Sequence, residues 1–424
     1  MEAKKSWWFL SSLILVCSLV LFACGGGGSS SSDTGSTETT TGSVAVLVTD
    51  APSDEFKAIE VTITGISIID DEDNLVEIWS MPSGQIINLL ELETEAELFA
   101  LASDVPVGLY NKIRLQVSAV ELVNFDDSRI DVDVPASGKI DLNPRGHFYV
   151  SADETLVVQL DLDANKSIHL VNPNHYRLRP VVFVDILTAV DIGRLVRLPG
   201  EILSVDSVNN QFVLLYQNRE FLIHVDNDTL YFGPQGTTTT FAELAVEDLV
   251  SVIGHFRVGS DDSQPEFDAV LVEEGDYQRL RGTVTVGVNS VTVTEDGGEP
   301  VVVNLDPDTA YYDCFGMVIT YADLVDGQRV AVDAVRVDDT YYAALIVACY
   351  DGADTLSGEL EVIDLLTLTV DGQCAQEAAA ARYYLLGDDS LTEIGRADLS
   401  VGTNVLLYGD DDVCFSYRQL FSIE

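Results

Sequence analysis

Apolar and polar residues alternate along much of the first half of the chain. Between residues 43 and 192, apolar side chains recur at every second position, and turn-forming residues separate the runs. This is the period of a strand that buries one face, and several short strands of this kind predict a β-sandwich. The clearest runs are Ile59, Val61 and Ile63; Ile113, Leu115 and Val117; Ile130, Val132 and Val134; and Leu156, Val158 and Leu160.

One stretch of this region, residues 89–102, breaks the alternation. Its Leu, Glu and Ala residues have a spacing that a helix could adopt. We therefore expect a short helix here, crossing between two strands of the sandwich.

After residue 193 the sequence repeats three times. Each copy opens on a strand with a central glycine, at Gly200, Gly282 and Gly358. An Asp-Thr or Asp-Ser pair and, later, an acidic residue followed by Leu come in the same order in every copy. Conserved order at similar offsets indicates three copies of one β unit. Short strands that close on themselves leave no exposed edge, so we expect each copy to be a small OB-like barrel.

The first 42 residues follow neither pattern. Lys4 and Lys5 precede an apolar run at 7–22, then Cys24, then a string of Gly, Ser and Thr. This order is typical of a bacterial lipoprotein precursor, in which the cysteine carries a diacylglycerol after cleavage. The apolar run is too short for an ordinary membrane span, which would need about 18 residues or more. Gly25 follows the cysteine, and by resemblance to enterobacterial lipoproteins this favours the outer membrane.

The predicted fold class is therefore all-β, with an N-terminal β-sandwich followed by three small OB-like β-barrel repeats. We expect six segments along the chain. They are a lipoprotein signal peptide at 1–23, a lipidated Cys24 with a flexible tether at 24–42, the β-sandwich at 43–192, and barrel repeats at 193–276, 277–352 and 353–424.

The chain is strongly acidic, with 22 Lys and Arg against 70 Asp and Glu, a formal net charge of −48. Such a charge argues against nucleic acid and anionic lipid surfaces as partners. Hydrophobic residues make up 47% of the chain, which excludes wholesale disorder. Three explanations of the acidity stay open: solubility, binding of divalent cations, and attraction to a basic partner.

Cysteine usage fits an oxidising compartment. Once Cys17 leaves with the signal and Cys24 carries lipid, four cysteines remain, which suits two disulfides. Four cysteines allow three pairings, but the repeats favour one bond within each of the last two barrels. These bonds would join Cys314 with Cys349 and Cys374 with Cys414.

Carboxylates in predicted turns make calcium a possible cofactor, because calcium takes six to eight oxygen ligands. The candidate ligands are Asp70, Asp71 and Asp73 in one turn and Asp161 and Asp163 in another. Neither group has the EF-hand pattern. The alternative is that these are solvated turn carboxylates with no ion.

Three motifs in residues 43–189 resemble domain-of-unknown-function family 4382. They are Val48-Thr49-Asp50-Ala51-Pro52, then Val105 to Tyr110 with Ile113-Arg114-Leu115, and Leu160-Asp161-Leu162-Asp163-Ala164 with Ser167. The family-motif residues are Asp50, Pro52, Tyr110, Arg114, Asp161, Asp163 and Ser167. The three repeats are similar to domain-of-unknown-function family 5666. Both resemblances imply a surface β-protein, and neither implies a reaction.

No sequence motif of a catalytic nucleophile, a zinc hydrolase or a phosphate-binding loop occurs in the chain. We therefore expect no enzymatic activity. We expect a lipid-anchored cell-envelope protein whose acidic β-modules bind a partner or have a structural role. The partner would be a protein, a matrix polymer or a divalent cation. One alternative is a carbohydrate-binding surface protein, although Trp79 is the only tryptophan outside the signal. A hydrolase that uses carboxylates is the other alternative.

Overall fold

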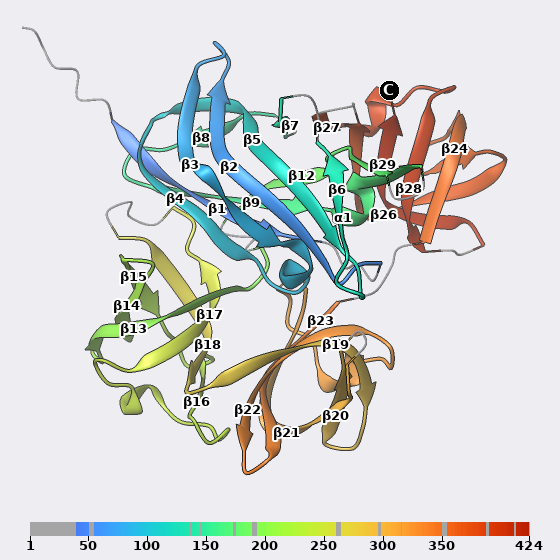
Figure 1. Ribbon diagram of the computed structural model, residues 1–424. Coiled ribbons are helices and arrows are strands. Elements are labelled where there is room, and N and C mark those ends of the chain that lie inside the picture. Colours follow the sequence, from blue (N-terminus) through green and yellow to red (C-terminus); the bar gives the residue numbers. More distant parts are fainter. Residues whose placement is uncertain are drawn as a thin grey trace, which may run out of the picture. The chain divides into compact units, whose positions relative to one another are not determined.

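The computed structural model describes residues 40–50, 55–134, 137–144, 146–172, 175–188, 193–259, 264–295, 298–314, 316–349, 354–386, 390–410 and 413–423. The predicted signal peptide, Cys24 and Pro52 lie outside these ranges. Within them the chain is almost entirely strand (Figure 1), so the predicted all-β class is confirmed. The helical elements described are one short turn, α1 (Ala164–Ser167), and four 3-10 turns. No helix among the described residues is long and apolar enough to cross a membrane.

Two sheets that share one core form the N-terminal sandwich. The first has the order β12-β9-β1-β4, in which β1 and β9 run parallel. The second is built on β2, β3 and β5. Strands β6, β7 and β8 pair with β5, β11 and β10 follow beyond β6, and β7 pairs with β27 (Ser390–Ile394) of the third repeat. The strands are β1 (Thr41–Thr49), β2 (Ala58–Asp70), β3 (Leu75–Asn88), β4 (Glu97–Pro106), β5 (Gly108–Val123), β6 (Arg129–Asp133), β7 (Lys139–Asn143), β8 (Phe148–Val150), β9 (Thr155–Leu162), β10 (Ile168–Asn172), β11 (His175–Leu178) and β12 (Val182–Ile186).

The alternation in the sequence corresponds to the core of this sandwich. Ile63, Leu115 and Leu160 all point into it and are fully buried. Strand β1 departs from strict alternation because both of its faces are covered. Val46 packs in the sandwich core, whereas Leu47 packs in a second core with the first barrel repeat.

The helix predicted over 89–102 is wrong. Only η1 (Leu89–Leu92) is helical, as one 3-10 turn, and β4 begins at Glu97. Strand β4 pairs antiparallel with β1 and buries Phe99 and Ala100. Pairing and burial at the edge of an existing sheet outweigh the weak helical preference of Leu, Glu and Ala.

Each of the three repeats is a ring of five paired strands, and the second is a closed barrel in the order β19-β20-β21-β23-β22. The first closes through β15 and β18, and the third through β26 and β29. The elements are β13 (Val196–Asp206), β14 (Gln211–Tyr216), β15 (Arg219–His224), β16 (Leu230–Phe232), η2 (Phe241–Glu243), β17 (Leu249–Phe256) and β18 (Glu266–Glu274); β19 (Tyr277–Val286), β20 (Ser290–Thr294), β21 (Val301–Asp313), η3 (Tyr321–Asp323), β22 (Arg329–Val337) and β23 (Thr340–Cys349); and β24 (Asp354–Ile363), β25 (Thr367–Val370), β26 (Gln373–Leu386), β27 (Ser390–Ile394), η4 (Arg396–Asp398), β28 (Asn404–Asp410) and β29 (Phe415–Ile423).

The landmarks of the repeats have equivalent structural roles. A side chain at Gly200 or Gly282 would meet a carbonyl oxygen of the neighbouring strand at 2.4 or 2.1 Å, so only glycine fits there. Thr229 and Thr309 are buried, and each donates its hydroxyl to a carbonyl of the neighbouring strand at 2.9 Å. The residues that recur in the sequence therefore occupy equivalent positions in the first two barrels, where the barrel geometry requires that residue type.

Candidate functional site

The predicted calcium ligands near residue 70 are occupied within their own turn. Asp70 accepts hydrogen bonds from the Asn74 side-chain amide at 2.9 Å, the Asn74 N–H at 2.8 Å and the Glu72 N–H at 2.9 Å, and these bonds lower its pKa. Asp71 faces His147 Nε2 at 2.8 Å. Asp73 adopts a positive φ of 62°, as turn residues do. These carboxylates shape the turn between β2 and β3 and do not converge on a common point.

Asp161 and Asp163 belong to a buried network that also contains Asp50. Asp50 Oδ1 accepts the Ala164 N–H at 3.0 Å, and Asp163 accepts the Lys166 N–H at 3.0 Å as the N-cap of α1. Burial raises the pKa of Asp161, whose carboxylate lies 3.8 Å from Arg194. Among the described residues no group of three or more Asp, Glu, His or Cys side chains is placed to hold a metal ion.

The remaining family-motif residues also hold structure together. The Tyr110 hydroxyl donates to the Pro106 carbonyl at 2.7 Å. Arg114 makes two hydrogen bonds to Asp141, at 2.5 and 2.7 Å. The Val181 N–H donates to Ser167 Oγ at 2.8 Å. The first and third motifs meet because β1 and β9 are parallel neighbours, so that residues 50 and 161 come together at one end of the first sheet.

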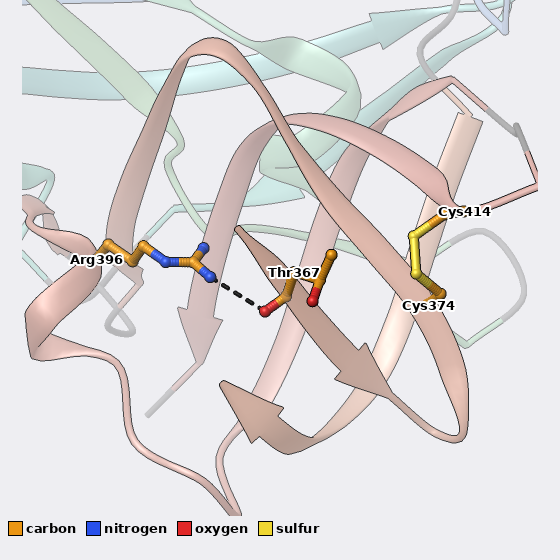
Figure 2. Close-up of a disulfide and its surroundings, with 4 residues drawn as sticks. All are labelled: Thr367, Cys374, Arg396 and Cys414. Carbon is orange, nitrogen blue, oxygen red and sulfur yellow. Dashed lines mark hydrogen bonds between the residues drawn. A yellow bond between two sulfur atoms is a disulfide. The ribbon is translucent and has the colours of Figure 1, made fainter. Parts of the chain in front are cut away.

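The cysteines divide into one bonded pair and one free pair. Cys374 and Cys414 form a disulfide in the third repeat (Figure 2), where Arg396 also donates to the Thr367 carbonyl at 3.1 Å. The bond between Cys314 and Cys349 stays a prediction: both thiols are free and buried, and their side chains lie close enough to hydrogen-bond each other. The Cys349 thiol donates to the Glu93 carbonyl at 3.4 Å.

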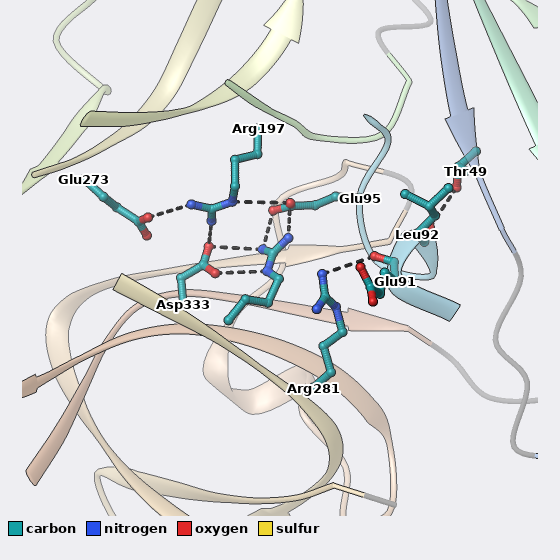
Figure 3. Close-up of polar contacts among 9 residues, drawn as sticks. Thr49, Glu91, Leu92, Glu95, Arg197, Glu273, Arg281 and Asp333 are labelled. Atoms are coloured by element: carbon teal, nitrogen blue, oxygen red, sulfur yellow. Dashed lines mark hydrogen bonds and ion pairs between the residues drawn. The ribbon is translucent and has the colours of Figure 1, made fainter. Parts of the chain in front are cut away.

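A cluster of buried charges, which the sequence did not indicate, lies where the sandwich meets the first two repeats. Its five members are Glu95, Arg197, Glu273, Arg279 and Asp333, and we call them the junction cluster (Figure 3). The three carboxylates are 6%, 1% and 1% exposed. Their positions come from three separate modules, because Glu95 precedes β4, Arg197 and Glu273 lie on β13 and β18, and Arg279 and Asp333 lie on β19 and β22.

Strand pairing builds the centre of this cluster. Arg279 and Asp333 are direct partners across the β19–β22 pair. Arg279 donates to both oxygens of Asp333, at 3.0 and 3.1 Å, and also contacts Glu95. Arg197 Nη1 donates to Glu273 at 2.8 Å, contacts Asp333, and has its Nε 3.6 Å from Glu95. Both guanidinium groups are therefore committed to carboxylates of the protein itself.

Burial sets the protonation of the junction cluster. Two guanidinium groups face three carboxyl groups, which would leave one surplus negative charge. Burial, and next the charge of Asp333, raise the pKa of Glu273 to about 8. Its carboxyl is therefore mostly protonated at neutral pH, and the cluster is close to neutral overall, as a buried set of charges must be.

Residues 91–97 supply the acidic side of the junction, and we call them the acidic segment. They run from the second half of η1 to the first residue of β4. The segment is held to the end of β1, because the Thr49 hydroxyl and the Asp50 N–H both donate to the Leu92 carbonyl, each at 3.2 Å. Further along, Glu93 pairs with Arg329 at 3.2 Å and its carbonyl accepts from Arg194 at 2.6 Å. The segment is thus clamped between the modules.

A cavity of about 320 Å³ opens beside the junction cluster. The cluster members Glu95, Arg197, Arg279 and Asp333 form one side of its wall. The side chains of Glu91, Glu97, Tyr216, Tyr277 and Arg281 also line the cavity. Burial, and next the charge of Glu91, raise the pKa of Glu97.

Arg281 differs from the other two arginines of the cavity. Its Nη2 donates to the Glu91 carbonyl at 3.2 Å, and its buried Nε has no partner among the described residues. Unlike Arg197 and Arg279, it forms no ion pair with any described carboxylate. Burial lowers the pKa of its guanidinium. The charges of Glu91 and Asp333 act on this guanidinium, but neither carboxylate forms an ion pair with it.

One sequence signal could have pointed to this site. Arg197 and Arg279 each stand three positions before the repeated glycine of their copy. In a chain with only 22 basic residues, two arginines at the same repeat position indicate a shared role. Their carboxylate partner Glu95 lies far away in the sequence, so no local pattern connects the three.

The comparisons with known proteins concern the N-terminal domain. Residues 41–180 match a family described as a domain of unknown function (DUF4382). No curated protein matches the chain. The matched range runs from β1 through β11 and includes the buried network around Asp50 and Asp161. The resemblance predicted for this part of the chain is thereby confirmed, and the N-terminal domain is similar to the DUF4382 family.

Proposed function

We propose that this chain is a lipid-anchored protein of the outer membrane that binds a carbohydrate in the cavity beside the junction cluster. The anchoring rests on the sequence around Cys24, and the binding role rests on the cavity. Its volume of about 320 Å³ is in the range of small-ligand sites. The repeats are interpreted as copies of a surface β unit similar to family 5666.

The chemistry of the cavity wall favours a polyhydroxylated ligand. Hydroxyl groups both donate and accept, and this wall offers carboxylates that accept and guanidinium groups that donate. Tyr216 and Tyr277 add two rings, whose apolar faces suit the C–H face of a sugar. The Tyr277 hydroxyl is fixed by donation to the Gly233 carbonyl at 2.8 Å, so this ring is held in place before a ligand arrives.

A panel of immobilised oligosaccharides tests the binding role. We expect the full mature chain, from Cys24 onward in mild detergent, to bind at least one member. Tyr216→Ala should weaken that binding about tenfold or more, because a ring of this size contributes on the order of 1 kcal/mol beyond its buried area. Tyr149→Ala is the matched control, since Tyr149 is 51% exposed on β8 and does not line the cavity. Failure to bind any sugar, or equal binding by Tyr216→Ala, contradicts the proposal.

Anchoring has its own test. Cys24→Ala removes the thiol that would carry lipid, and we expect the protein to move from the membrane fraction to the soluble fraction. A Cys17→Ala variant is the control, because that cysteine lies within the predicted signal. If the Cys24→Ala protein stays with the membrane, the lipoprotein interpretation is wrong.

Hydrolysis is the second candidate function, and Glu97 is the observation that favours it. A cavity carboxyl whose pKa is raised by burial can act as a general acid. The carboxylates of Glu95 and Asp333 are instead bound by arginines. Incubation of any bound oligosaccharide with the protein, followed by analysis of reducing ends, distinguishes the two functions, because binding alone releases none.

A further inference from the structure

Building on the proposed carbohydrate site, we propose that its ligand is an acidic sugar, in which a carboxylate of the uronic acid type pairs with Arg281. The other two arginines of the cavity are already bound to carboxylates of the protein. The hydrogen-bonding edge of Arg279 is taken by Asp333 and Glu95, and Arg197 is shared among Glu273, Asp333 and Glu95. An incoming anion would have to displace a buried carboxylate from either of them.

Arg281 has no ion-paired carboxylate among the described residues that an incoming anion would have to displace. It lies on β19 two positions beyond Arg279, lines the same cavity, and makes one hydrogen bond, to the Glu91 carbonyl. An unpaired charge that is partly withdrawn from water raises the free energy of the folded protein. The chain carries 70 acidic residues, yet none that the structure describes forms an ion pair with this guanidinium. A ligand carboxylate would supply the missing counter-charge.

The acidic residues of the cavity limit how much negative charge the ligand can carry. Glu91 and Glu97 line the same space as Arg281. Their carboxylates repel an anionic ligand, so a ligand with one negative charge meets less repulsion there than a ligand with two. A phosphate group carries about −1.5 to −2 charges at pH 7 and would meet roughly twice the repulsion. A carboxylate is therefore favoured over a phosphate.

The two tyrosines explain why the carboxylate should belong to a sugar. A simple carboxylate such as acetate would pair with Arg281 but leave the surfaces of Tyr216 and Tyr277 uncovered. A pyranose ring with a carboxylate at its sixth carbon can place its charge on Arg281 and its ring against one of these tyrosines. Hydroxyl groups of the same ring remain to donate to Glu91 and Glu97.

Calorimetric titration of the full mature chain tests this assignment. The probes are D-glucuronate, D-glucose, glucose 6-phosphate and acetate at equal ionic strength. We expect glucuronate to bind at least tenfold more tightly than each of the other three. Arg281→Gln should reduce glucuronate affinity to that of glucose, and Arg281→Lys should retain part of the preference. Arg336→Gln is the control, because Arg336 is an exposed arginine of the same barrel that pairs with Asp339.

The outcomes separate this inference from the proposed function. Equal binding of glucose and glucuronate by the parent protein overturns the acidic-sugar assignment and leaves the carbohydrate site standing. Tighter binding of glucose 6-phosphate or acetate also overturns it. Absence of binding to every sugar, here and on the oligosaccharide panel, overturns both. Melting temperatures of the variants show whether they are folded, and we expect Arg281→Gln to melt no lower than the parent, because it removes an unpaired charge.

Discussion

Burial at the junction between the modules changes the pKa of one residue in particular, Glu273. Its carboxyl is 1% exposed and lies between Arg197, which it hydrogen-bonds, and Asp333, whose charge repels it. Burial and this repulsion raise its pKa to about 8. Relative to an ordinary glutamate, whose pKa in an unfolded chain is about 4.3, its protonated form is strongly favoured in the folded state.

The consequence is a pH-dependent stability. For a group whose pKa is raised by folding, the contribution to stability is complete below the unfolded pKa and disappears as the pH rises through the folded value. Glu273→Gln keeps a neutral side chain that can accept from Arg197. The parent therefore loses stability as the pH rises from 5 to 8, and we expect Glu273→Gln to become more stable relative to the parent over this range.

Urea denaturation at several pH values measures this difference. Glu274→Gln is the control, because it changes a more exposed neighbour on the same strand. A Glu273→Gln protein with the same pH dependence as the parent would show that Glu273 does not titrate in this range.

At the scale of elements, the sequence predicted what depends on local geometry. The alternation in β5 and β9 follows from the pleat of a strand, and the repeated glycines follow from close approach of a neighbouring carbonyl. The helix expected at 89–102 failed, because pairing of β4 with β1 is a contact that no local window contains. The pairing of Cys314 with Cys349 was predicted from the repeats, and the structure brings these two buried side chains together as free thiols.

The cysteine pairs give a prediction at this scale. The disulfide between Cys374 and Cys414 closes a loop with a sequence separation of 40, which should contribute about 4 kcal/mol to stability. A reducing agent should therefore lower the melting temperature of the parent and of a Cys314→Ala, Cys349→Ala double variant by the same amount. A Cys374→Ala, Cys414→Ala variant should not respond to it. If this variant remains sensitive to reduction, Cys314 and Cys349 are bonded in the isolated protein.

For the molecule as a whole, the junction cluster connects modules that are distant in the sequence. The Arg279–Glu95 contact spans 184 positions, and the Arg329–Glu93 contact spans 236. Periodicity and repeats describe each module by itself, so they cannot indicate which charges of different modules meet. The same patterns could not indicate the cavity, because residues of the sandwich and of two repeats together form its wall.

Breaking the junction should therefore affect more than one module. Arg279→Gln leaves Glu95 and Asp333 buried without their main cation, and loss of one partner of a buried ion pair costs about 3 to 5 kcal/mol. Arg336→Gln, at an exposed pair, should cost less than about 1 kcal/mol. Chemical denaturation followed by circular dichroism compares the two. Equal stability of both variants would mean that the junction cluster does not hold the modules together.

The position of a bound sugar is the most direct test of the binding site. A crystal structure of the full mature chain with D-glucuronate should place the sugar in the cavity between the acidic segment and β19, with its carboxylate on Arg281 and its ring against Tyr216 or Tyr277. A sugar bound elsewhere on the molecule, or a cavity that stays empty at a concentration that saturates binding in solution, would contradict the site.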